Sequence, residues 1–432
     1  MKKLIDRISE AFEKYNLIFL GAVIAIYLVS RYVYLGEICY YMDIDELGSA
    51  IDSVKIANGS ENIMQHPSVL VIAAAMIFKV KGGLFSLKLY RLISVAGGLV
   101  SLIFSYLTVK EMTGQKKYAL LEALLCATLP IYFISSRTGV SAYMTLWLAP
   151  AAFFFLIKAM NSKKRPYYAV SALFFIAVIL TILGEDHKMG FSNIPTNILN
   201  IKSLVWDDSH PFNISSTFGT IYSFSVPVLI AGIIISVKKT AASIKNRTVD
   251  ANVVLWIYTL VMLFTSLLTK DADTRSACGL FFAASLFICE GLIWLCENIK
   301  GVIIIELAVY LICLKVFAGY YFENFNSEVN NSSDHEAGIV VDKSVGEAVK
   351  ASLNLFADKQ IAVISEDFEG RDLMIDLFGN SNVRIGKDED PAIDGSTVYV
   401  INQTEHQDII DYLTSQGWGN LYLKEYTVCY MQ

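Results

Sequence analysis

The chain is poor in charge and lacks the cysteine patterns of metal-binding and disulfide-rich proteins. Only 18% of its 432 residues are Asp, Glu, Lys or Arg, whereas 54% are hydrophobic, which departs from the composition of ordinary soluble domains. The seven cysteines include no CxxC pair and no ligand-like spacing to histidine. No basic stretch with interleaved aromatic side chains indicates nucleic-acid binding. Cys39 and Cys429 are the one pair that we consider for a disulfide outside the cell, and the missing disulfide framework argues against it.

What the sequence does contain is a series of apolar runs of membrane length. A spanning helix needs roughly 20 apolar residues, and the candidates are 16–35, 89–109, 117–135, 142–160, 166–184, 217–237, 251–269, 276–296 and 301–321. The chain is therefore interpreted as a multi-span membrane protein. Basic residues precede the first run, and no small-residue cleavage site follows it. We expect an uncleaved signal anchor with a cytoplasmic N-terminus.

The apolar run Val69–Phe78 is too short to span, and its placement decides the sidedness of the rest. If it lies along the outer surface as an interfacial helix, the basic loops 110–117, 158–165 and 238–247 face the cytoplasm. With this placement, four basic residues near the short run lie outside the cell, which argues against it. The eleven basic residues of the three loops lie on the cytoplasmic side, which outweighs them. The outer loop 36–88, the loop 185–216 and everything after residue 322 are then extracytoplasmic.

The composition changes after residue 322, which predicts a separate C-terminal domain. We divide the chain into a membrane domain (1–322), an Asn/Ser-rich linker (323–343) and a small α/β domain (344–432). Within this domain, strands are expected at 360–365, 397–402 and 420–429, and helices at 344–357, 369–379 and 405–416. The domain has no glycine-rich phosphate loop and no nucleophile elbow. We expect it to cover the site or to dock an acceptor.

Several short motifs follow one another in a fixed order over residues 16–320. They are Asp45-Glu46, His66-Pro67, Arg91-Leu92-Ile93-Ser94, Gly114-Gln115-Lys116-Lys117, Ser136-Arg137 and Tyr143-Met144. Their order resembles that of the GT-C glycosyltransferases, and more narrowly the family-39-like branch of protein O-mannosyltransferases and aminoarabinose transferases. The resemblance implies an all-α membrane GT-C fold with about nine transmembrane helices, interfacial helices in the first outer loop, and a small extracytoplasmic α/β domain. It also implies that a sugar moves, with inversion, from a polyprenyl-phosphate donor.

Three carboxylates, Asp43, Asp45 and Glu46, follow directly after the first apolar run. An acceptor hydroxyl is a poor nucleophile, and it needs a carboxylate within hydrogen-bond reach to take its proton. The resemblance matches the family's first-loop aspartate to Asp45, with Glu46 in support and Asp43 as a weaker candidate on the acceptor or sugar side. The alternative is that these acids only solvate the end of a loop. Acids at a membrane edge are costly to place and are often functional, which favours catalysis.

A lipid-phosphate leaving group requires cations, and three residues are candidates for binding it. Arg137 and Arg275 lie at outer ends of predicted spans, where a guanidinium can form a bidentate pair with phosphate. The alternative for both is snorkelling towards lipid headgroups. Lys315 lies inside the last predicted span, where it contacts the headgroup or pairs with a buried acid such as Glu290.

The remaining candidates belong to the acceptor or sugar side: Tyr143, His66, Asp207, Asp208 and His210. Asp207, Asp208 and His210 have atoms that suit a divalent cation such as Mg or Mn, although adjacent aspartates are more often a turn. No cofactor is expected to be required. His66 precedes Pro67 and fits the start of a helix.

One position departs from the family pattern. Many relatives carry an aspartate a few residues after the arginine of the Ser-Arg turn, where this chain has Ala142. If that acid helps to recognise the donor sugar, this protein takes a different sugar or is less active. Alternatively, Tyr143 fills the space.

These observations predict an enzyme: a glycosyltransferase of a prokaryotic plasma membrane. Its acceptor is expected to be a cell-envelope glycan, lipid or protein on the outer face. The rival hypothesis is a lipid-linked-sugar transporter or a non-catalytic binding protein, in which Glu122, Glu290 and Glu306 form a proton relay. Against transport, the sequence has no internal inverted repeat and no pair of broken spans in matching positions.

Overall fold

The computed structural model describes residues 10–35, 41–63, 68–82, 85–184, 190–201, 218–269, 273–299, 301–330, 340–342, 344–364, 369–378, 382–385 and 395–431. The chain divides into two compact units. The helical unit comprises Met1–Ile38, Met64–Ala73 and Leu87–Phe325. The α/β unit comprises Cys39–Ile63, Ala74–Ser86 and Asn326–Gln432. Two pieces of the expected outer loop, 39–63 and 74–86, therefore belong to the same unit as the C-terminal region.

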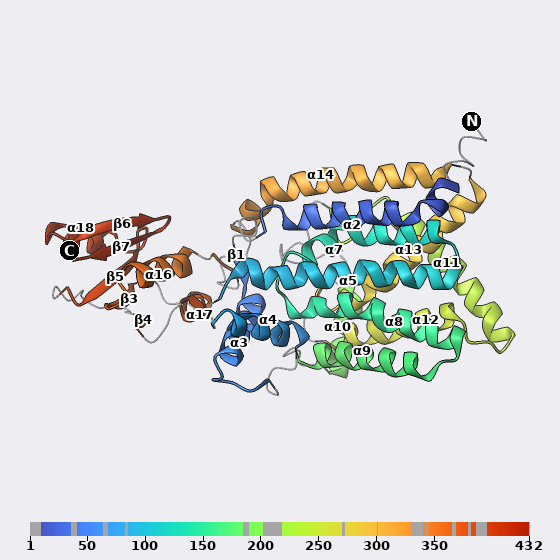
Figure 1. The fold of residues 1–432 in the computed structure, drawn as a ribbon, viewed down its shortest axis with the longest axis horizontal. Coiled ribbons are helices and arrows are strands. Elements are labelled where there is room, and N and C mark those ends of the chain that lie inside the picture. Colours follow the sequence, from blue (N-terminus) through green and yellow to red (C-terminus); the bar gives the residue numbers. More distant parts are fainter. Residues whose placement is uncertain are drawn as a thin grey trace. The chain divides into compact units, whose positions relative to one another are not determined.

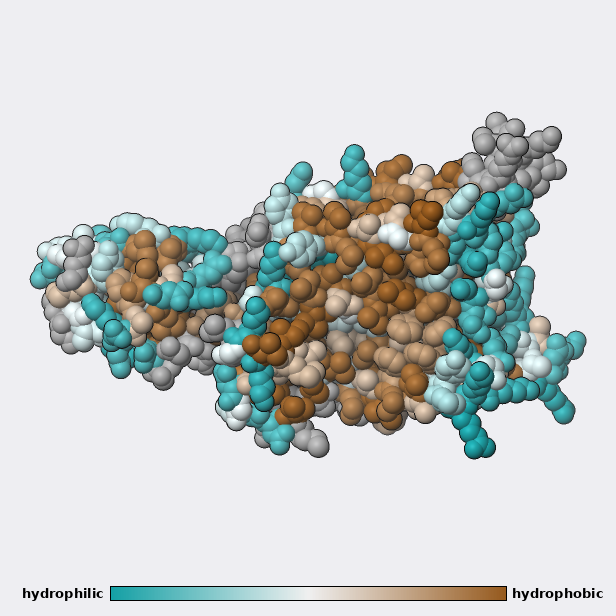
Figure 2. Space-filling view, viewed as in Figure 1, coloured by the Kyte–Doolittle hydropathy of each residue, from teal (hydrophilic) through white to brown (hydrophobic). Residues whose placement is uncertain are grey.

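Long helices that run alongside one another build the helical unit (Figure 1). They are α2 (Asn16–Tyr32), α5 (Leu87–Thr113), α6 (Lys116–Thr128), α7 (Pro130–Ser135), α8 (Met144–Ser162), α9 (Arg165–Gly184), α11 (Ser225–Lys245), α12 (Ala251–Leu268), α13 (Cys278–Asn298) and α14 (Val302–Asn330), with the short pieces η2 (Ser141–Tyr143), η3 (Phe191–Asn193) and α10 (Ile194–Leu199). Apolar residues cover the middle of their visible surface, and hydrophilic residues lie towards the helix ends (Figure 2).

Seven helices in the described part of the chain are long and apolar enough to cross a membrane. They are Leu87–Thr113, Ser141–Ser162, Arg165–Ile182, Ser225–Lys245, Ala251–Leu268, Cys278–Asn298 and Val302–Asn324. The protein is a multi-pass membrane protein, but the predicted count of nine spans is not confirmed. The run Val69–Phe78 forms the apolar helix α4 (Val69–Val80), which has 12 residues and is too short to span unaided.

The two predicted spans that fall short of this length do so for identifiable reasons. The first, α2, has 17 helical residues. The run 117–135 is not one helix but two, α6 and α7, with Leu129 extended between them. Proline restricts the preceding residue to extended backbone and is well tolerated at a helix start, so Pro130 ends one helix and begins the next. The predicted span 217–237 also begins later, at Ser225.

The centre and the periphery of the helical unit differ in burial. Every residue of α6 from Tyr118 to Thr128 is buried, whereas only 11–22% of the apolar windows of α9, α11 and α12 is buried, as is typical of lipid-facing helices. The helices α11 and α13 approach backbone to backbone: a Cβ added to Gly232 would collide with the Phe287 carbonyl, and one on Gly291 with the Val228 carbonyl. Small residues at a crossing permit this close van der Waals packing, which drives association within lipid.

The α/β unit contains a two-stranded ribbon and a five-stranded sheet. In the ribbon, β1 (Tyr41–Asp43) pairs antiparallel with β2 (Val340–Asp342). The sheet has the order β4-β3-β5-β7-β6 and consists of β3 (Gln360–Ile364), β4 (Val383–Ile385), β5 (Thr397–Asn402), β6 (Gly419–Leu423) and β7 (Tyr426–Tyr430). Strands β4, β3 and β5 are parallel, and β7 and β6 add antiparallel. The helices are α3 (Ile44–Ala57), α16 (Ser344–Leu355), α17 (Glu369–Phe378) and α18 (Gln407–Ser415).

Most elements predicted after residue 344 are confirmed, and the differences are local. The last predicted strand is a hairpin, because the chain turns at Lys424, which has a φ of 56°. The helix α14 continues to Asn330, so the segment predicted as a linker begins as helix. Cys429 carries no disulfide: its thiol is buried in the sheet core, and burial raises the pKa of this thiol to about 12.

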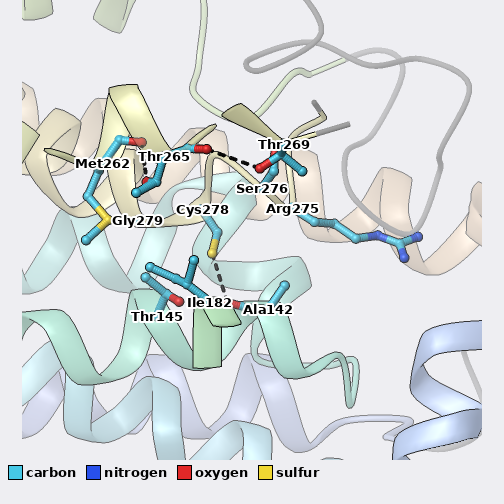
Figure 3. A pocket seen from close by; sticks show the side chains of 10 residues that line it. All are labelled: Ala142, Thr145, Ile182, Met262, Thr265, Thr269, Arg275, Ser276, Cys278 and Gly279. Carbon is cyan, nitrogen blue, oxygen red and sulfur yellow. Dashed lines mark hydrogen bonds between the residues drawn. The ribbon is translucent and has the colours of Figure 1, made fainter. Parts of the chain in front are cut away.

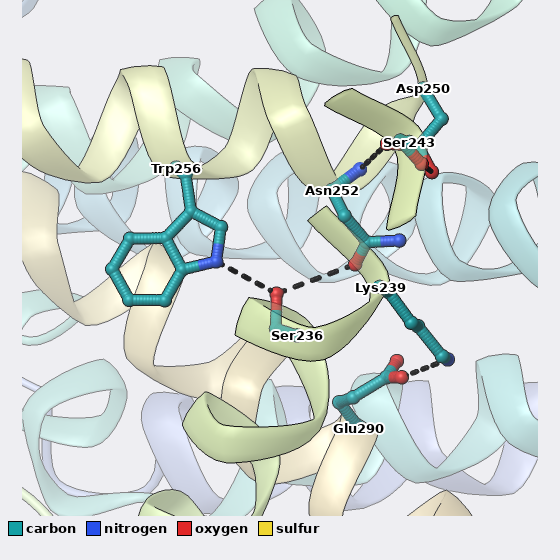
Figure 4. A network of polar contacts seen from close by, with 7 residues as sticks. All are labelled: Ser236, Lys239, Ser243, Asp250, Asn252, Trp256 and Glu290. Atoms are coloured by element: carbon teal, nitrogen blue, oxygen red, sulfur yellow. Dashed lines mark hydrogen bonds and ion pairs between the residues drawn. The ribbon is translucent and has the colours of Figure 1, made fainter. Parts of the chain in front are cut away.

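Asp250 is the N-cap of α12, and Figure 4 shows it near the hydrogen bond from Trp256 to Ser236 and the separate Lys239–Glu290 ion pair. Its Oδ1 accepts hydrogen bonds from the amides of Asn252 (3.1 Å) and Val253 (3.0 Å). Its Oδ2 accepts one from Ser243 Oγ at 2.7 Å. Burial alone would raise the pKa of this carboxyl, but the hydrogen bonds together outweigh burial, and the pKa is lowered. The carboxylate form therefore stabilises the start of the helix.

We predict that Asp250→Ala lowers the free energy of unfolding by about 1 kcal/mol, because it removes the N-cap. Asp250→Asn keeps a capping oxygen and loses less. Since the folded-state pKa lies below the unfolded value of about 3.9, the charge-dependent stability is complete above that pH and is lost as the pH falls through the folded pKa. Thermal unfolding midpoints in detergent, measured from about pH 7 down to about pH 3, check this. An Asp250→Asn midpoint that falls with pH as steeply as wild type would contradict it.

Candidate functional site

The acidic stretch begins where strand β1 becomes helix α3. Asp43 ends the strand in extended conformation and is the N-cap of the helix, because its Oδ1 accepts a hydrogen bond from the Asp45 amide at 2.9 Å. Aspartate is among the preferred N-cap residues, since its short side chain satisfies an amide that has no partner within the helix. The Asp43 side chain is fully buried. Its position therefore fits a capping role for this carboxylate.

The two acids in the first turn of α3 differ in exposure. Asp45 is exposed, whereas Glu46 is fully buried beside Leu47. The N-terminus of a helix favours negative charge, because its amides and its dipole point towards it. The arrangement thus presents one carboxylate to solvent from a structurally fixed turn and places its neighbour inside the unit.

Arg137 follows α7, and its side chain is fully buried in the helical unit. Its guanidinium donates to four carbonyl oxygens at the end of α2, those of Ser30, Arg31, Val33 and Tyr34, at 2.6–3.3 Å. Three aromatic rings lie 5.1–5.6 Å from it: Phe133, Tyr321 and Phe322. The last carbonyls of a helix lack partners and carry partial negative charge. Arg137 therefore caps α2 where no water reaches, and its Nε alone has no partner within the described chain.

Arg31, in the last turn of α2, is a second buried cation that sequence reasoning did not single out. Its Nε donates to Ser136 Oγ at 3.2 Å and its Nη1 to Ser30 Oγ at 2.8 Å. The guanidinium lies 4.7 Å from the Tyr27 ring and 4.6 Å from the Phe133 ring. Its Nη2 has no partner among the described residues. The signal that could have found it is an arginine inside the first apolar run, since charges within a span are seldom incidental.

Arg275 and Ala142 line one small cavity among α8, α9, α12 and α13 (Figure 3). Its volume of about 20 Å³ corresponds to one or two water molecules. Hydroxyl groups contribute much of the lining: Thr145, Thr265, Thr269 and Ser276. The Cys278 thiol donates to the Ala142 carbonyl at 2.9 Å. The guanidinium of Arg275 extends away from this thiol, so the cation points out of the cluster of hydroxyls.

The position that carries an acid in many relatives thus lines the same cavity as Arg275, although the Arg275 guanidinium points away from it. Ala142 contributes only a methyl group and its backbone to the cavity, and Tyr143, which follows it, is fully buried at the start of α8. Ala142 and Arg275 therefore belong to one local environment, which the sequence alone did not indicate.

Other candidates are placed apart from this environment. Lys315 is exposed on α14, and Glu290 pairs with Lys239 instead. His66, Asp207, Asp208 and His210 lie outside the described residues. Over the described ranges, no three His, Cys, Asp or Glu side chains are arranged to hold a metal ion.

The three acids of the rival hypothesis each have a local contact. Glu122 is fully buried and accepts a hydrogen bond from Ser285 Oγ at 2.7 Å. Glu306 accepts one from the Cys296 thiol at 3.3 Å, and Glu290 pairs with Lys239. Within the part of the chain that the structure covers, no hydrogen bond joins any two of these carboxylates.

The fold is similar to that of a solved archaeal oligosaccharyltransferase. The Archaeoglobus fulgidus oligosaccharyltransferase in complex with Zn and sulfate matches with a TM-score of 0.51 at 12% identity, over 92% of this chain and 69% of that chain. The Archaeoglobus fulgidus oligosaccharyltransferase AglB with an inhibitory peptide and a dolichol-phosphate has a TM-score of 0.46 at 12% identity, over 98% and 75%. No family model and no curated protein matches the chain. The first likeness concerns the fold alone, and it does not single out the family-39-like branch that the motifs predict.

We predict that Arg137→Lys lowers the free energy of unfolding of the helical unit by about 2 kcal/mol, because an ammonium group cannot donate to four carbonyls as the planar fork does. Thermal unfolding in detergent measures the loss. Lys315→Gln, an exposed position of the same unit, serves as the control and should leave the midpoint unchanged. An Arg137→Lys protein with the wild-type midpoint would show that the bonds to α2 contribute nothing net.

Proposed function

We propose that this protein is an inverting membrane glycosyltransferase that moves a sugar from a polyprenyl-phosphate donor to a hydroxyl acceptor on the outer face of a prokaryotic plasma membrane. The acceptor is a cell-envelope glycan, lipid or protein. The motif resemblance and the likeness in fold to an oligosaccharyltransferase support a glycosyltransferase. The proposal also keeps the cytoplasmic N-terminus and the extracytoplasmic C-terminal domain that the basic loops predict.

The observation that carries the proposal is the contrast among the three acids of the α3 start. Asp43 is used as the cap and Glu46 is buried, so Asp45 is the acid that a substrate can reach. In the proposed step, the Asp45 carboxylate takes the proton of the acceptor hydroxyl as its oxygen attacks the anomeric carbon. Glu46 supports the orientation of this turn.

The leaving group is the second part of the step. The bond between the anomeric carbon and the phosphate oxygen breaks, and the polyprenyl phosphate leaves with the electron pair. Attack from the opposite face inverts the anomeric centre. A cation must stabilise the charge that develops on phosphate, and we assign this role first to Arg275. Arg137 has committed most of its N–H groups to α2, and Lys315 is exposed on α14, so both remain secondary candidates.

Donor selection follows from the same assignment. Ala142 shares a cavity with Arg275, and a methyl group there can offer no hydrogen bond to a sugar hydroxyl. We propose that the donor differs from the sugar of relatives that carry an acid at this position. Tyr143, Asp207, Asp208 and His210 stay candidates for the acceptor or sugar side, and no metal is required by the proposed step.

The test is Asp45→Asn, which keeps the size of the side chain but removes the base. We expect release of polyprenyl phosphate from a panel of polyprenyl-phosphate sugars to fall by about 10²- to 10⁴-fold, with donor binding unchanged. Glu61→Gln is the matched control, because Glu61 is an acid of the same unit that pairs with Lys55 at its surface. It should leave the rate unaltered.

A transporter would behave differently. It should keep moving lipid-linked sugar across vesicles when Asp45 is changed to Asn. Donor binding without any phosphate release from the wild-type protein, over the whole donor panel, would favour this rival.

A further inference from the structure

Strand β1, which leads into the acidic turn, has its strand partner near the other end of the chain. The register is Tyr41 opposite Asp342, Met42 opposite Val341, and Asp43 opposite Val340. All of these residues belong to the α/β unit. The backbone of the N-cap residue is therefore held by β2, a segment of the C-terminal region.

The pairing of β1 with β2 also fixes the position of Asp45, which lies two residues after the last paired residue, Asp43. Asp43 is both the last paired residue of β1 and the acceptor of the Asp45 amide, at 2.9 Å. Any shift of β1 along or away from β2 displaces the cap, and with it the first turn of α3. Positions that carry catalytic groups must be fixed to within about 0.5 Å, and a misplacement of about 1 Å can cost 10²-fold in rate.

A second contact ties the same region together. Helix α17 packs against α3 and against β2. Its last residue, Phe378, stacks edge-to-face on Phe85 with ring centroids 5.2 Å apart, and Phe85 meets Phe78 in the same way at 5.6 Å. The Phe378 ring also lies so close to Gly346 that an added Cβ would collide with it. A two-stranded ribbon is marginally stable on its own, and the packing of α17 on both β2 and α3 supports it from one side.

We propose that β2, Val340–Asp342, is a positioning segment for Asp45, so that the C-terminal region is required for the chemical step itself. This rests on the proposed role of Asp45 as base. It goes beyond the covering or docking role expected for the C-terminal domain. Loss of the ribbon should slow the chemical step while leaving the donor bound.

The test uses Val340→Pro and Val341→Pro in the full-length protein, each against its alanine counterpart. Amides of neighbouring residues in an antiparallel strand point alternately towards and away from the partner, so one of the two prolines must remove a donor from the ribbon. We expect that variant to lose at least tenfold in kcat at saturating acceptor, with unchanged donor affinity and thermal midpoint. Hydrogen exchange should increase at the amides of residues 41–46, and the alanine variants should match wild type.

A reversible rescue separates positioning from general damage. In the affected proline variant, with Cys39 changed to Ser, the changes Tyr41→Cys and Asp342→Cys place thiols on directly opposite residues, where a disulfide fits the spacing of paired strands. Oxidation should restore most of the lost kcat, and reduction should remove it again.

Three results would overturn the proposal: a wild-type kcat in both proline variants, a parallel loss of donor binding, or a cross-link that restores nothing. Failure of the proposed function would look different, because no protein, wild type included, would release polyprenyl phosphate. Hydrogen exchange at α3 would still report whether β2 holds the acidic turn.

Discussion

The candidate site depends on one hydrogen bond, which the Asp45 amide donates to the Asp43 carboxylate. It determines where α3 begins and therefore which of three neighbouring acids faces outward. A helix start offers several amides without partners, and an acidic cluster at that place would otherwise have several ways to satisfy them. Here one acid is used for the helix, one is buried, and one is exposed. The division of roles comes from backbone geometry, because two of the three acids are chemically identical aspartates.

In the helical unit, the cation Arg137 satisfies backbone groups at the end of a helix, as the Asp43 carboxylate does at the start of α3. In a membrane interior, no water can hydrogen-bond to the last carbonyls of a helix. At the end of α2, Arg137 donates hydrogen bonds to four such carbonyls. Arg31 lies against the same Phe133 ring. Among the described residues, the two buried guanidiniums thus contact carbonyls, hydroxyls and aromatic faces. A positively charged residue at a span end is as consistent with completing a helix as with holding a ligand, and only the contacts distinguish the two.

Sequence reasoning predicted what depends on local pattern. Apolar length located the helices of the bundle, and short strand-like runs located β3 and β5 closely. It predicted a single element where one residue divides the chain into two: Pro130 separates α6 from α7, and the turn at Lys424 separates the two strands of the last hairpin. It could not find the pairing of β1 with β2, because strands of three residues have little periodicity and their partners lie far apart in sequence. For the same reason, it placed Ala142 and Arg275 in separate arguments although they line one cavity.

The distance along the chain between β1 and β2, about 300 residues, has a consequence for biosynthesis. At ribosomal rates of about 5–20 residues per second, the acidic turn waits roughly 15–60 s after its own synthesis before its partner strand exists. Throughout that interval, the helices can insert and pack while the turn lacks its strand partner. The β1–β2 ribbon can therefore form only after residues 340–342 have been synthesised, long after the acidic turn and most of the helices.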